Sequence, residues 1–297
     1  MKIKYTILLL LLLALPAYAD NVTHVSVGTY VLNVGKFEVS TGSYTIDFYL
    51  DFRCDTNCSP ERFEFTNGRA TSIDKLIDTP TEKFYRIQAS LSQNIDLRKY
   101  PFDRHSLTIE LEDKDKTTDE QVYIADIENS GTDPSVIIVG WHLDGWNAGV
   151  REHYYEPYNQ TFSRYIYSIE IGRVPLTSML KSFLPVFFMV FVALLSLLLR
   201  ADKVTTRLTL NISTLLAAVM FHVNLTSTIP PVGYLTFADK FMIATYLILI
   251  MVLFSGIMLM RHTELKEEVM AEKLYKYALF SIPVITIIAY IMIFLLV

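Results

Sequence analysis

The chain has only two cysteines among its 297 residues, and it lacks the motifs by which enzymes are commonly recognised. It contains no P-loop, no nucleophile elbow, no His/Cys cluster and no recognisable pair of catalytic carboxylates, and its six histidines are scattered singly. Basic charge is not in excess either, since 31 Asp and Glu outnumber 26 Lys and Arg. This balance argues against a nucleic-acid partner. The absences predict a protein that is not an enzyme and that uses no cofactor.

The two cysteines, Cys54 and Cys58, are separated by three residues. In an oxidising compartment such a pair can close a small disulfide at a loop tip. Free thiols are an alternative. A metal site is disfavoured, because it would need two more ligands and no further histidine or cysteine lies close in the sequence. We therefore treat Cys54 and Cys58 as a candidate disulfide and expect no metal.

The first 19 residues have the pattern of a secretory signal peptide. Two lysines precede a short apolar run, and Ala17-Tyr18-Ala19 matches a small-x-small cleavage motif. An uncleaved anchor helix is the alternative, but the apolar run is short for one. We expect residues 1–19 to be removed and the mature N-terminus to be extracellular or periplasmic.

Residues 20–174 are polar and acidic, with 25 Asp and Glu against 15 Lys and Arg and a net charge of −10; the remainder of the chain carries +5. Apolar and polar residues alternate here in short runs separated by turn-forming residues. In the clearest run Tyr44, Ile46, Phe48, Leu50 and Phe52 share one face. The density of such runs predicts an extracellular β-sandwich of the immunoglobulin-like kind. The predicted strands are Thr29–Val34, Tyr44–Phe52, Arg62–Phe65, Phe84–Leu91, Ser106–Leu111 and Tyr165–Ile171.

Residues 175–297 contain four apolar segments, each near the roughly 20 residues that cross the hydrocarbon core of a bilayer. We expect a transmembrane domain of four helices, at about 176–199, 204–228, 237–261 and 272–297. Basic residues cluster between the first two segments and between the last two, whereas the middle link carries only Asp239 and Lys240 as charges. The positive-inside rule then places the N-terminal domain outside. The chain is thus predicted to be a multi-pass protein of the plasma (inner) membrane, in contact with membrane lipid.

The second apolar segment carries polar residues at regular intervals. At about 100° per residue they form one narrow stripe with hydroxyl groups near its ends and bulky apolar side chains at mid-depth. The stripe residues are Thr209, Ser213, Leu216, Met220, Val223 and Ser227. Such a stripe suits the wall of a narrow aqueous pore with a hydrophobic constriction. The alternative is a bundle helix whose Ser and Thr side chains bond to neighbouring helices or to their own backbone carbonyls.

The N-terminal domain joins the first apolar segment at Arg173 without a flexible linker. In the segment Asp96–Asp103, Pro101 makes a rigid, charged loop tip that ends in Asp103. We expect Asp103, Arg173 and Glu38 to meet at the junction as a partly buried ion cluster. Exposed surface charges of little energetic value are the alternative for each of them.

In this order, these features resemble the pentameric ligand-gated ion channels (the Cys-loop receptor superfamily), in particular its short prokaryotic members. The resemblance covers nearly the whole mature chain. Besides the signal peptide and the β-rich domain, it rests on Tyr100-Pro101-Phe102-Asp103, Gly140-Trp141, Arg173 before the first span, Pro185 within it, the run 209–215, Pro230 after the second span and Tyr234 in the following link.

The resemblance implies a homopentamer in which the second helix of each subunit lines a central pore for inorganic ions. By position, the stripe residues would face the lumen and Leu216 would form the hydrophobic gate. Glu38, Asp103 and Arg173 would form a coupling cluster that acts on the link containing Pro230. The agonist would be a small molecule or protons. His222, inside the second span, could sense pH or could simply pack against a neighbouring helix.

The resemblance also points to aromatic residues that would face a ligand and hold an organic cation by cation–π contact. These candidates are Tyr123, Trp141, Trp146, Tyr154, Tyr155 and Tyr158. Core and interface packing is the alternative for each of them. The chain departs from the family at the two cysteines that give it its name, which are replaced by Gln93 and Leu107, and it has no Trp-x-Pro segment before Tyr100.

Ion preference is less clearly encoded than the pore. The cytoplasmic mouth reads Thr205-Thr206-Arg207 and has no carboxylate, but the acidic N-terminal domain favours cations. We expect a cation-preferring channel. The alternative function is a non-conducting, membrane-anchored periplasmic binding or signalling receptor with the same fold, against which the alignment of the hydroxyl groups argues.

Overall fold

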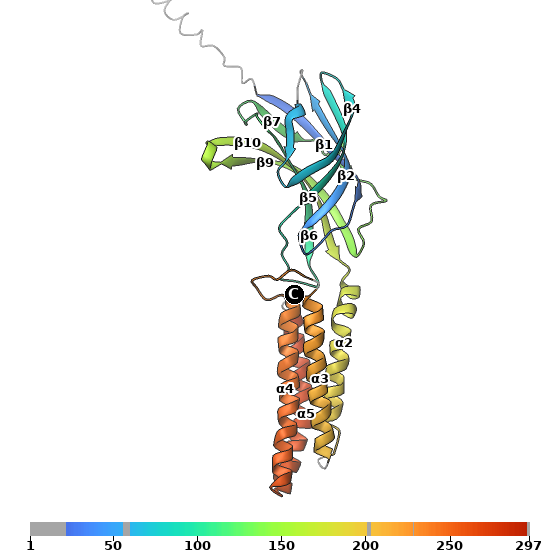
Figure 1. The fold of residues 1–297 in the computed structure, drawn as a ribbon, viewed down its shortest axis with the longest axis vertical. Coiled ribbons are helices and arrows are strands. Elements are labelled where there is room, and N and C mark those ends of the chain that lie inside the picture. Colours follow the sequence, from blue (N-terminus) through green and yellow to red (C-terminus); the bar gives the residue numbers. More distant parts are fainter. Residues whose placement is uncertain (1–21, 56–59, 201–202, 228, 296–297) are drawn as a thin grey trace, which may run out of the picture.

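The computed structural model describes residues 22–55, 60–200, 203–227 and 229–295. The expected signal peptide and Cys58 lie outside these residues, so cleavage and the Cys54–Cys58 disulfide stay predictions. A β-sandwich and a bundle of long helices are stacked end to end along the long axis of the molecule (Figure 1). We call residues 22–173 the sandwich domain and residues 174–295 the helical domain.

Ten strands form two sheets in the described part of the sandwich domain. One sheet has the order β4-β5-β2-β1-β7, with β8 paired to β1, and the other has the order β3-β6-β10-β9. The strands are β1 (Thr23–Val34), β2 (Ser43–Cys54), β3 (Phe63–Phe65), β4 (Gly68–Asp78), β5 (Glu82–Ser92), β6 (Arg104–Asp113), β7 (Gln121–Ala125), β8 (Gly131–Thr132), β9 (Trp141–Tyr155) and β10 (Gln160–Arg173).

The core of the sandwich lies between the two sheets and follows the alternation of the sequence. Tyr44, Ile46, Phe48, Leu50 and Phe52 of β2 are all buried, and they pack with the inward-facing residues of β6 and β10. Successive side chains of a strand point to opposite faces, so one face of β2 supplies the core while the other faces outward. The predicted β-sandwich is confirmed.

The four helices of the helical domain are α2 (Pro175–Ser196), α3 (Val204–Thr226), α4 (Phe237–Glu264) and α5 (Glu268–Phe294). Pro175 starts α2 at a position where the missing N–H costs nothing. α4 starts with a capping box, in which Thr236 accepts from the Asp239 N–H and the Asp239 carboxylate accepts from the Thr236 N–H. All four helices are long and apolar enough to cross a membrane. The protein is therefore a multi-pass membrane protein.

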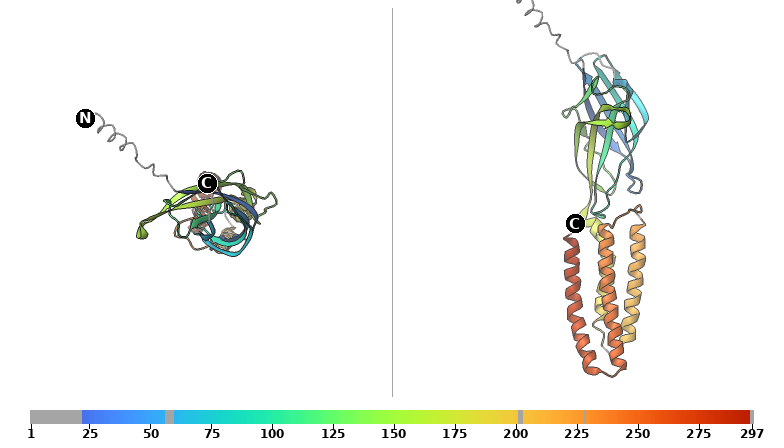
Figure 2. Two further views of the ribbon diagram at one scale, coloured as in Figure 1. Left: turned by 90° about the horizontal axis from the view of Figure 1, so that it is seen from above. Right: turned by 90° about the vertical axis from the view of Figure 1, so that its left-hand side faces the viewer.

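α4 is the central helix of the bundle and packs against α2, α3 and α5. The right-hand view of Figure 2 shows α3 and α5 on opposite sides of α4. α5 ends at the sandwich side of the bundle, where Phe294 contacts Phe183, Phe237 and Phe241. In the part of the chain that the structure describes, the other helices cover only one side of α3 and leave its opposite side exposed.

Candidate coupling site and pore helix

Arg173 and Asp103 form an ion pair at the junction of the two domains. Arg173 Nε donates to Asp103 Oδ1 at 2.8 Å, and the Asp103 side chain is fully buried while that of Arg173 is 23% exposed. β10 positions Arg173 at its last residue, and Asp103 ends the loop between β5 and β6. The structure thus brings together two of the three charges expected in the coupling cluster.

His105 and Arg173 together hold Asp103 in its charged form. Asp103 Oδ2 lies 2.7 Å from His105 Nε2, so each carboxylate oxygen has its own partner. Burial by itself would raise the pKa of Asp103, but the hydrogen bond from His105 and the charge of Arg173 outweigh it and hold the pKa below its usual range. The sequence analysis missed His105, although its place two residues after Asp103 on a strand puts both side chains on one face.

Two aromatic rings cover the guanidinium of Arg173. Its central carbon lies 4.5 Å from the centre of the Trp141 ring and 5.2 Å from that of Tyr100. Trp141 also contacts Phe37 and His105. Trp141 starts β9 at the domain junction and packs on the Arg173–Asp103 pair, where its π face stabilises the cation. Its ligand-facing role stays a prediction.

Glu38 stands apart from this pair. Its carboxylate accepts from Lys36 Nζ at 2.7 Å, and both side chains are well exposed. Within the described residues, no ion pair joins Glu38 to Asp103 or Arg173. The expected three-membered cluster is therefore wrong in this respect. Its neighbour Val39 instead packs on the apolar cluster beside the α3–α4 link.

Backbone hydrogen bonds attach the β5–β6 loop to the start of α4. Phe237 N donates to Arg98 O at 2.8 Å and Ala238 N donates to Tyr100 O at 3.0 Å. These are N–H groups of the first turn, which a helix cannot satisfy internally. Nearby, Leu97 N donates to the Tyr234 hydroxyl at 2.9 Å. The loop thereby caps α4 and grips the α3–α4 link in which Pro230 lies half-buried.

Phe102 inserts the loop tip into the helical domain. Its ring lies 5.5 Å from Phe237 of α4 and 6.0 Å from Phe183 of α2, and it packs against the buried apolar cluster of the bundle. An aromatic residue of the sandwich domain therefore packs, partly buried, against the core of the helical domain. A displacement of the loop must displace the outer ends of these two helices, because close-packed interiors transmit strain.

The two faces of α3 differ sharply. The face toward the other helices buries Val204, Arg207, Asn211, Thr214 and Ala218. The stripe Thr209, Ser213, Leu216, Met220 and Val223 lies on the opposite face and is exposed in the single chain, as is Ser227, which caps the end of the helix. Leu216, Met220 and Val223 are each more than 60% exposed.

Among the described residues, the hydroxyl groups of Thr209 and Ser227 bond to carbonyls of their own segment and not to neighbouring helices. Thr209 Oγ1 donates to Thr205 O at 3.0 Å and Ser227 Oγ donates to Asn224 O at 2.8 Å, both within the same segment. Helix-to-helix polar contacts come from the buried face instead, where Ser196 Oγ donates to Asn211 Oδ1 and Arg207 Nη2 to Ser255 Oγ. Packing between helices therefore does not account for the stripe.

Two of the remaining candidate ligand residues lie inside the sandwich domain. Tyr123 is buried in the core, 6.2 Å from the Phe52 ring, so its ligand-facing role is wrong in this structure. Trp146 is half-buried and stacks on Tyr167 at 5.6 Å. Core packing, the alternative left open by the sequence, accounts for both.

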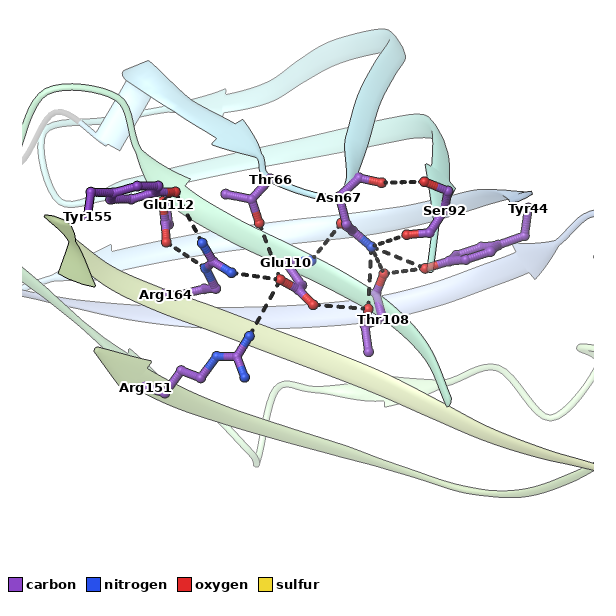
Figure 3. Close-up of polar contacts among 10 residues, drawn as sticks. All are labelled: Tyr44, Thr66, Asn67, Ser92, Thr108, Glu110, Glu112, Arg151, Tyr155 and Arg164. Atoms are coloured by element: carbon purple, nitrogen blue, oxygen red, sulfur yellow. Dashed lines mark hydrogen bonds and ion pairs between the residues drawn. The ribbon is translucent and has the colours of Figure 1, made fainter. Parts of the chain in front are cut away.

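The other three candidates lie on the hairpin between β9 and β10. Tyr158 and Tyr154 are exposed, and the Tyr154 hydroxyl donates to Asn159 Oδ1 at 3.1 Å. Tyr155 belongs to a polar network on the outer face of the second sheet (Figure 3). Its hydroxyl donates to Glu112 Oε2 at 2.8 Å and accepts from Arg164 Nη2 at 3.1 Å.

Arg164 is the centre of this network. It is buried, its Nε donates to Glu112 Oε1 at 2.5 Å, and its Nη1 donates to Glu110 Oε2 at 3.1 Å (Figure 3). Burial and the hydrogen bond to Glu112 raise the pKa of Tyr155. The sequence analysis missed Arg164 and Glu112, although both belong to alternating strand patterns. The network ties the root of the hairpin to β6.

A cavity of about 360 Å³ lies on the outward face of the first sheet, with Tyr30, Tyr49, Phe84, Asp51 and Glu128 among the residues that line it. Tyr49 and Phe84 stack at 5.2 Å. Asp51 is almost fully buried, and its Oδ2 lies 2.8 Å from Arg53 Nη2. Within the described residues its Oδ1 has no hydrogen-bond partner. Burial raises the pKa of Asp51 against the opposing charge of Arg53.

No protein-family model matches the chain. Among curated proteins it is similar to a proton-gated ion channel of Gloeobacter violaceus, with 25% identity over 170 residues. The match covers 57% of this chain and 47% of the relative, so the chain spans about half the length of the protein it matches. The sequence similarity to an ion channel, together with a β-sandwich followed by four membrane-length helices, confirms the resemblance indicated by the motifs.

Proposed function

We propose that the protein is the subunit of a pentameric ligand-gated channel that conducts ions through a central pore lined by α3. The observation that carries this proposal is the free face of α3. Its hydroxyl groups and its bulky apolar residues at mid-depth are aligned on the side that none of the described helices covers.

A pore accounts for this face better than lipid contact does. Lipid-facing positions favour apolar side chains throughout, because a polar group in hydrocarbon costs free energy. Ser213 is exposed on this face of α3 among exposed apolar residues. If several copies place this face around an axis, the hydroxyl groups line water and the ring of Leu216 side chains narrows and dewets the path.

The coupling site supports a gated pore rather than an open one. The sandwich domain enters the helical domain through Phe102 and caps α4 through the 97–100 backbone. A binding event in the sandwich domain can therefore shift the outer ends of the helices that hold α3. A non-conducting receptor needs no such contact between its N-terminal domain and the helices that pack against α3.

The agonist site that the geometry favours lies on the sandwich domain and suits a small organic cation. The 360 Å³ cavity offers stacked aromatic rings and is lined by the acidic residues Asp51 and Glu128. Aromatic faces and a carboxylate together recognise a quaternary or protonated amine. Protons are the second candidate agonist, because the relative is named a proton-gated channel. The net charge of −10 on residues 20–174 favours cations as the permeant ions.

Recording from the purified protein in planar bilayers tests this function. We expect discrete current steps that reverse close to the equilibrium potential of the permeant cation, and five subunits by native mass spectrometry. Bilayers without protein provide the control. An assembled, folded protein that carries no current under acidification or a panel of amines would favour the non-conducting receptor instead.

A further inference from the structure

The outer half of α3 is fastened to the first three turns of α4 by the side chains of His222, Asp239 and Tyr246. His222 Nε2 lies 3.1 Å from Asp239 Oδ1, and His222 Nδ1 lies 2.9 Å from the Tyr246 hydroxyl. Both His222 and Asp239 are mostly buried, with side-chain exposures of 21% and 18%. Within the described residues both polar partners of the His222 ring come from α4.

Asp239 is at the same time part of the α4 capping box. Its Oδ2 accepts from Thr236 N at 2.8 Å and from the Thr236 hydroxyl at 2.8 Å, while its Oδ1 faces His222. A single carboxylate therefore joins the start of α4 to the middle of the outer half of α3. Hydrogen bonds to an ionised group are shorter and stronger than those between neutral groups.

The sandwich domain holds the same turn of α4 from the other side. Arg98 O and Tyr100 O accept from Phe237 N and Ala238 N, the two residues before Asp239. A continuous chain of short contacts thus runs from the β5–β6 loop through the first turn of α4 to His222 of α3. No step in this chain passes through the α3–α4 link.

The covalent link between α3 and α4 is held by the sandwich domain along one side. Tyr234 accepts from Leu97 N and packs with Ile229 and Val232 on the apolar cluster around Leu97, whereas Pro231, Gly233 and Leu235 are exposed. The side-chain contact between the packed helices α3 and α4 is a separate route that runs beside this link.

We propose that the His222–Asp239–Tyr246 contact is a second coupling link, through which the β5–β6 loop acts on the pore helix by way of α4. His222 is a positioning residue in this scheme, since it acts on the pore only through α3. The inference rests on the proposed channel function and adds a route to it. The sequence left open whether His222 senses pH or packs against a neighbouring helix. The structure adds specific polar contacts of the His222 ring with α4 to simple packing.

Spontaneous opening in a Leu216→Ser background tests this link without a known agonist. Open probability is recorded in bilayers for His222→Ala, His222→Gln and Tyr246→Phe placed on that background. We expect His222→Ala to change the ratio of open to closed channels by about tenfold, the size of a lost contact between two neighbouring groups. His222→Gln keeps a donor toward Asp239 and should restore most of the wild-type ratio, which a loss of packing alone would not predict. Tyr246→Phe should have a smaller effect in the same direction.

Matched controls separate a coupling role from a general effect. His262→Ala removes a histidine that pairs with Glu267 at 2.6 Å at the other end of α4, and Tyr277→Phe removes an exposed hydroxyl of α5. Both should leave the ratio unchanged. A cycle with Tyr234→Phe, which removes the bond from Leu97 N, should be additive with His222→Ala, because the two contacts belong to parallel routes.

The outcomes distinguish this inference from the channel itself. Absence of current from assembled Leu216→Ser protein contradicts the proposed function. Normal current that His222→Ala and Tyr246→Phe leave unchanged overturns the second link and leaves the channel intact. If His222→Ala fails to assemble, the other two variants still test the contact. The contact is contradicted if Tyr246→Phe leaves the ratio of open to closed channels unchanged while His222→Gln fails to restore it.

Discussion

Arg173 Nε donates to Asp103 Oδ1 at 2.8 Å across 70 residues of sequence, and Trp141 covers the guanidinium from 4.5 Å. The pair joins the last residue of the sandwich domain to the loop that enters the bundle. Because Asp103 is fully buried, removal of Arg173 leaves a desolvated carboxylate with only His105 beside it.

Arg173→Ala should therefore impair gating strongly while the protein still assembles. Breaking a buried pair from one side costs about 3–5 kcal/mol, which is large against the few kcal/mol that separate conformational states of a switch. Asp103→Ala should have a similar effect, and the double variant should be less impaired than the sum of the two. A double-mutant cycle on the gating equilibrium measures this. Arg104→Ala, which removes an exposed arginine one residue beyond Asp103, is the control. Strict additivity of the two changes would mean that the pair does not contribute to gating.

Leu216→Ser should raise the leak of the resting channel. The substitution removes apolar surface from each subunit at the constriction, so water enters it more easily. Resting conductance in bilayers is the measurement. Leu210→Ser, on a different face of the same helix, is the matched control and should change the conductance less. An unchanged resting conductance in assembled Leu216→Ser protein would place the gate elsewhere.

The sandwich domain should lose stability in acid partly through Asp103. The pKa of Asp103 is lower in the folded protein than its usual value of about 3.9. The folded state therefore binds fewer protons than the unfolded state. The contribution of Asp103 to stability is fully present above the usual pKa of the unfolded state, and it disappears as the pH falls through the lower pKa of the folded state. Chemical denaturation of the wild type and of Asp103→Asn should differ at neutral pH and converge in acid. A difference that stays constant with pH would show that this carboxyl does not titrate as described.

Tyr155→Phe should loosen the β9–β10 hairpin. The substitution removes the hydroxyl that bridges Glu112 and Arg164, at a net cost of about 1–3 kcal/mol because charged partners lose a hydrogen bond. Hydrogen exchange across residues 150–162 should become faster. Tyr158→Phe, on the exposed tip of the same hairpin, should leave the exchange unchanged. Equal exchange in both variants would mean that the network does not hold the hairpin.

The sequence predicts those strands and helices that have one buried face and one exposed face. β2 alternates cleanly because one face supplies the core, and the stripe of α3 is visible because the opposite face is buried. β4 and β9 escaped prediction, since both are largely exposed and have no alternation to detect. Their existence depends on pairing with β5 and β10.

Residues of the site were predictable only where a motif marked them. Asp103 and Arg173 were expected to meet and do so, because a loop tip and a strand end are forced to the same junction. Glu38 was placed wrongly, since its local partner Lys36 satisfies it first. The contact of Trp141 with Arg173 could not be predicted, because sequence order says nothing about which end of a long strand faces the membrane. The contacts of His222 depend on how α3 packs on α4, and no pattern in either helix encodes that register.

Access of water to one face of α3 is the most direct test of the account. Ser213→Cys and Ala218→Cys place one thiol on the exposed stripe and one on the buried face of the same helix, with the Ala218 position fully buried. Currents are recorded while a charged, water-soluble thiol reagent is applied to conducting channels, with the wild type as the reagent control. The account predicts rapid, irreversible block at Ser213→Cys and none at Ala218→Cys. Equal block at both positions, or block at Ala218→Cys alone, would contradict a pore lined by this face of α3.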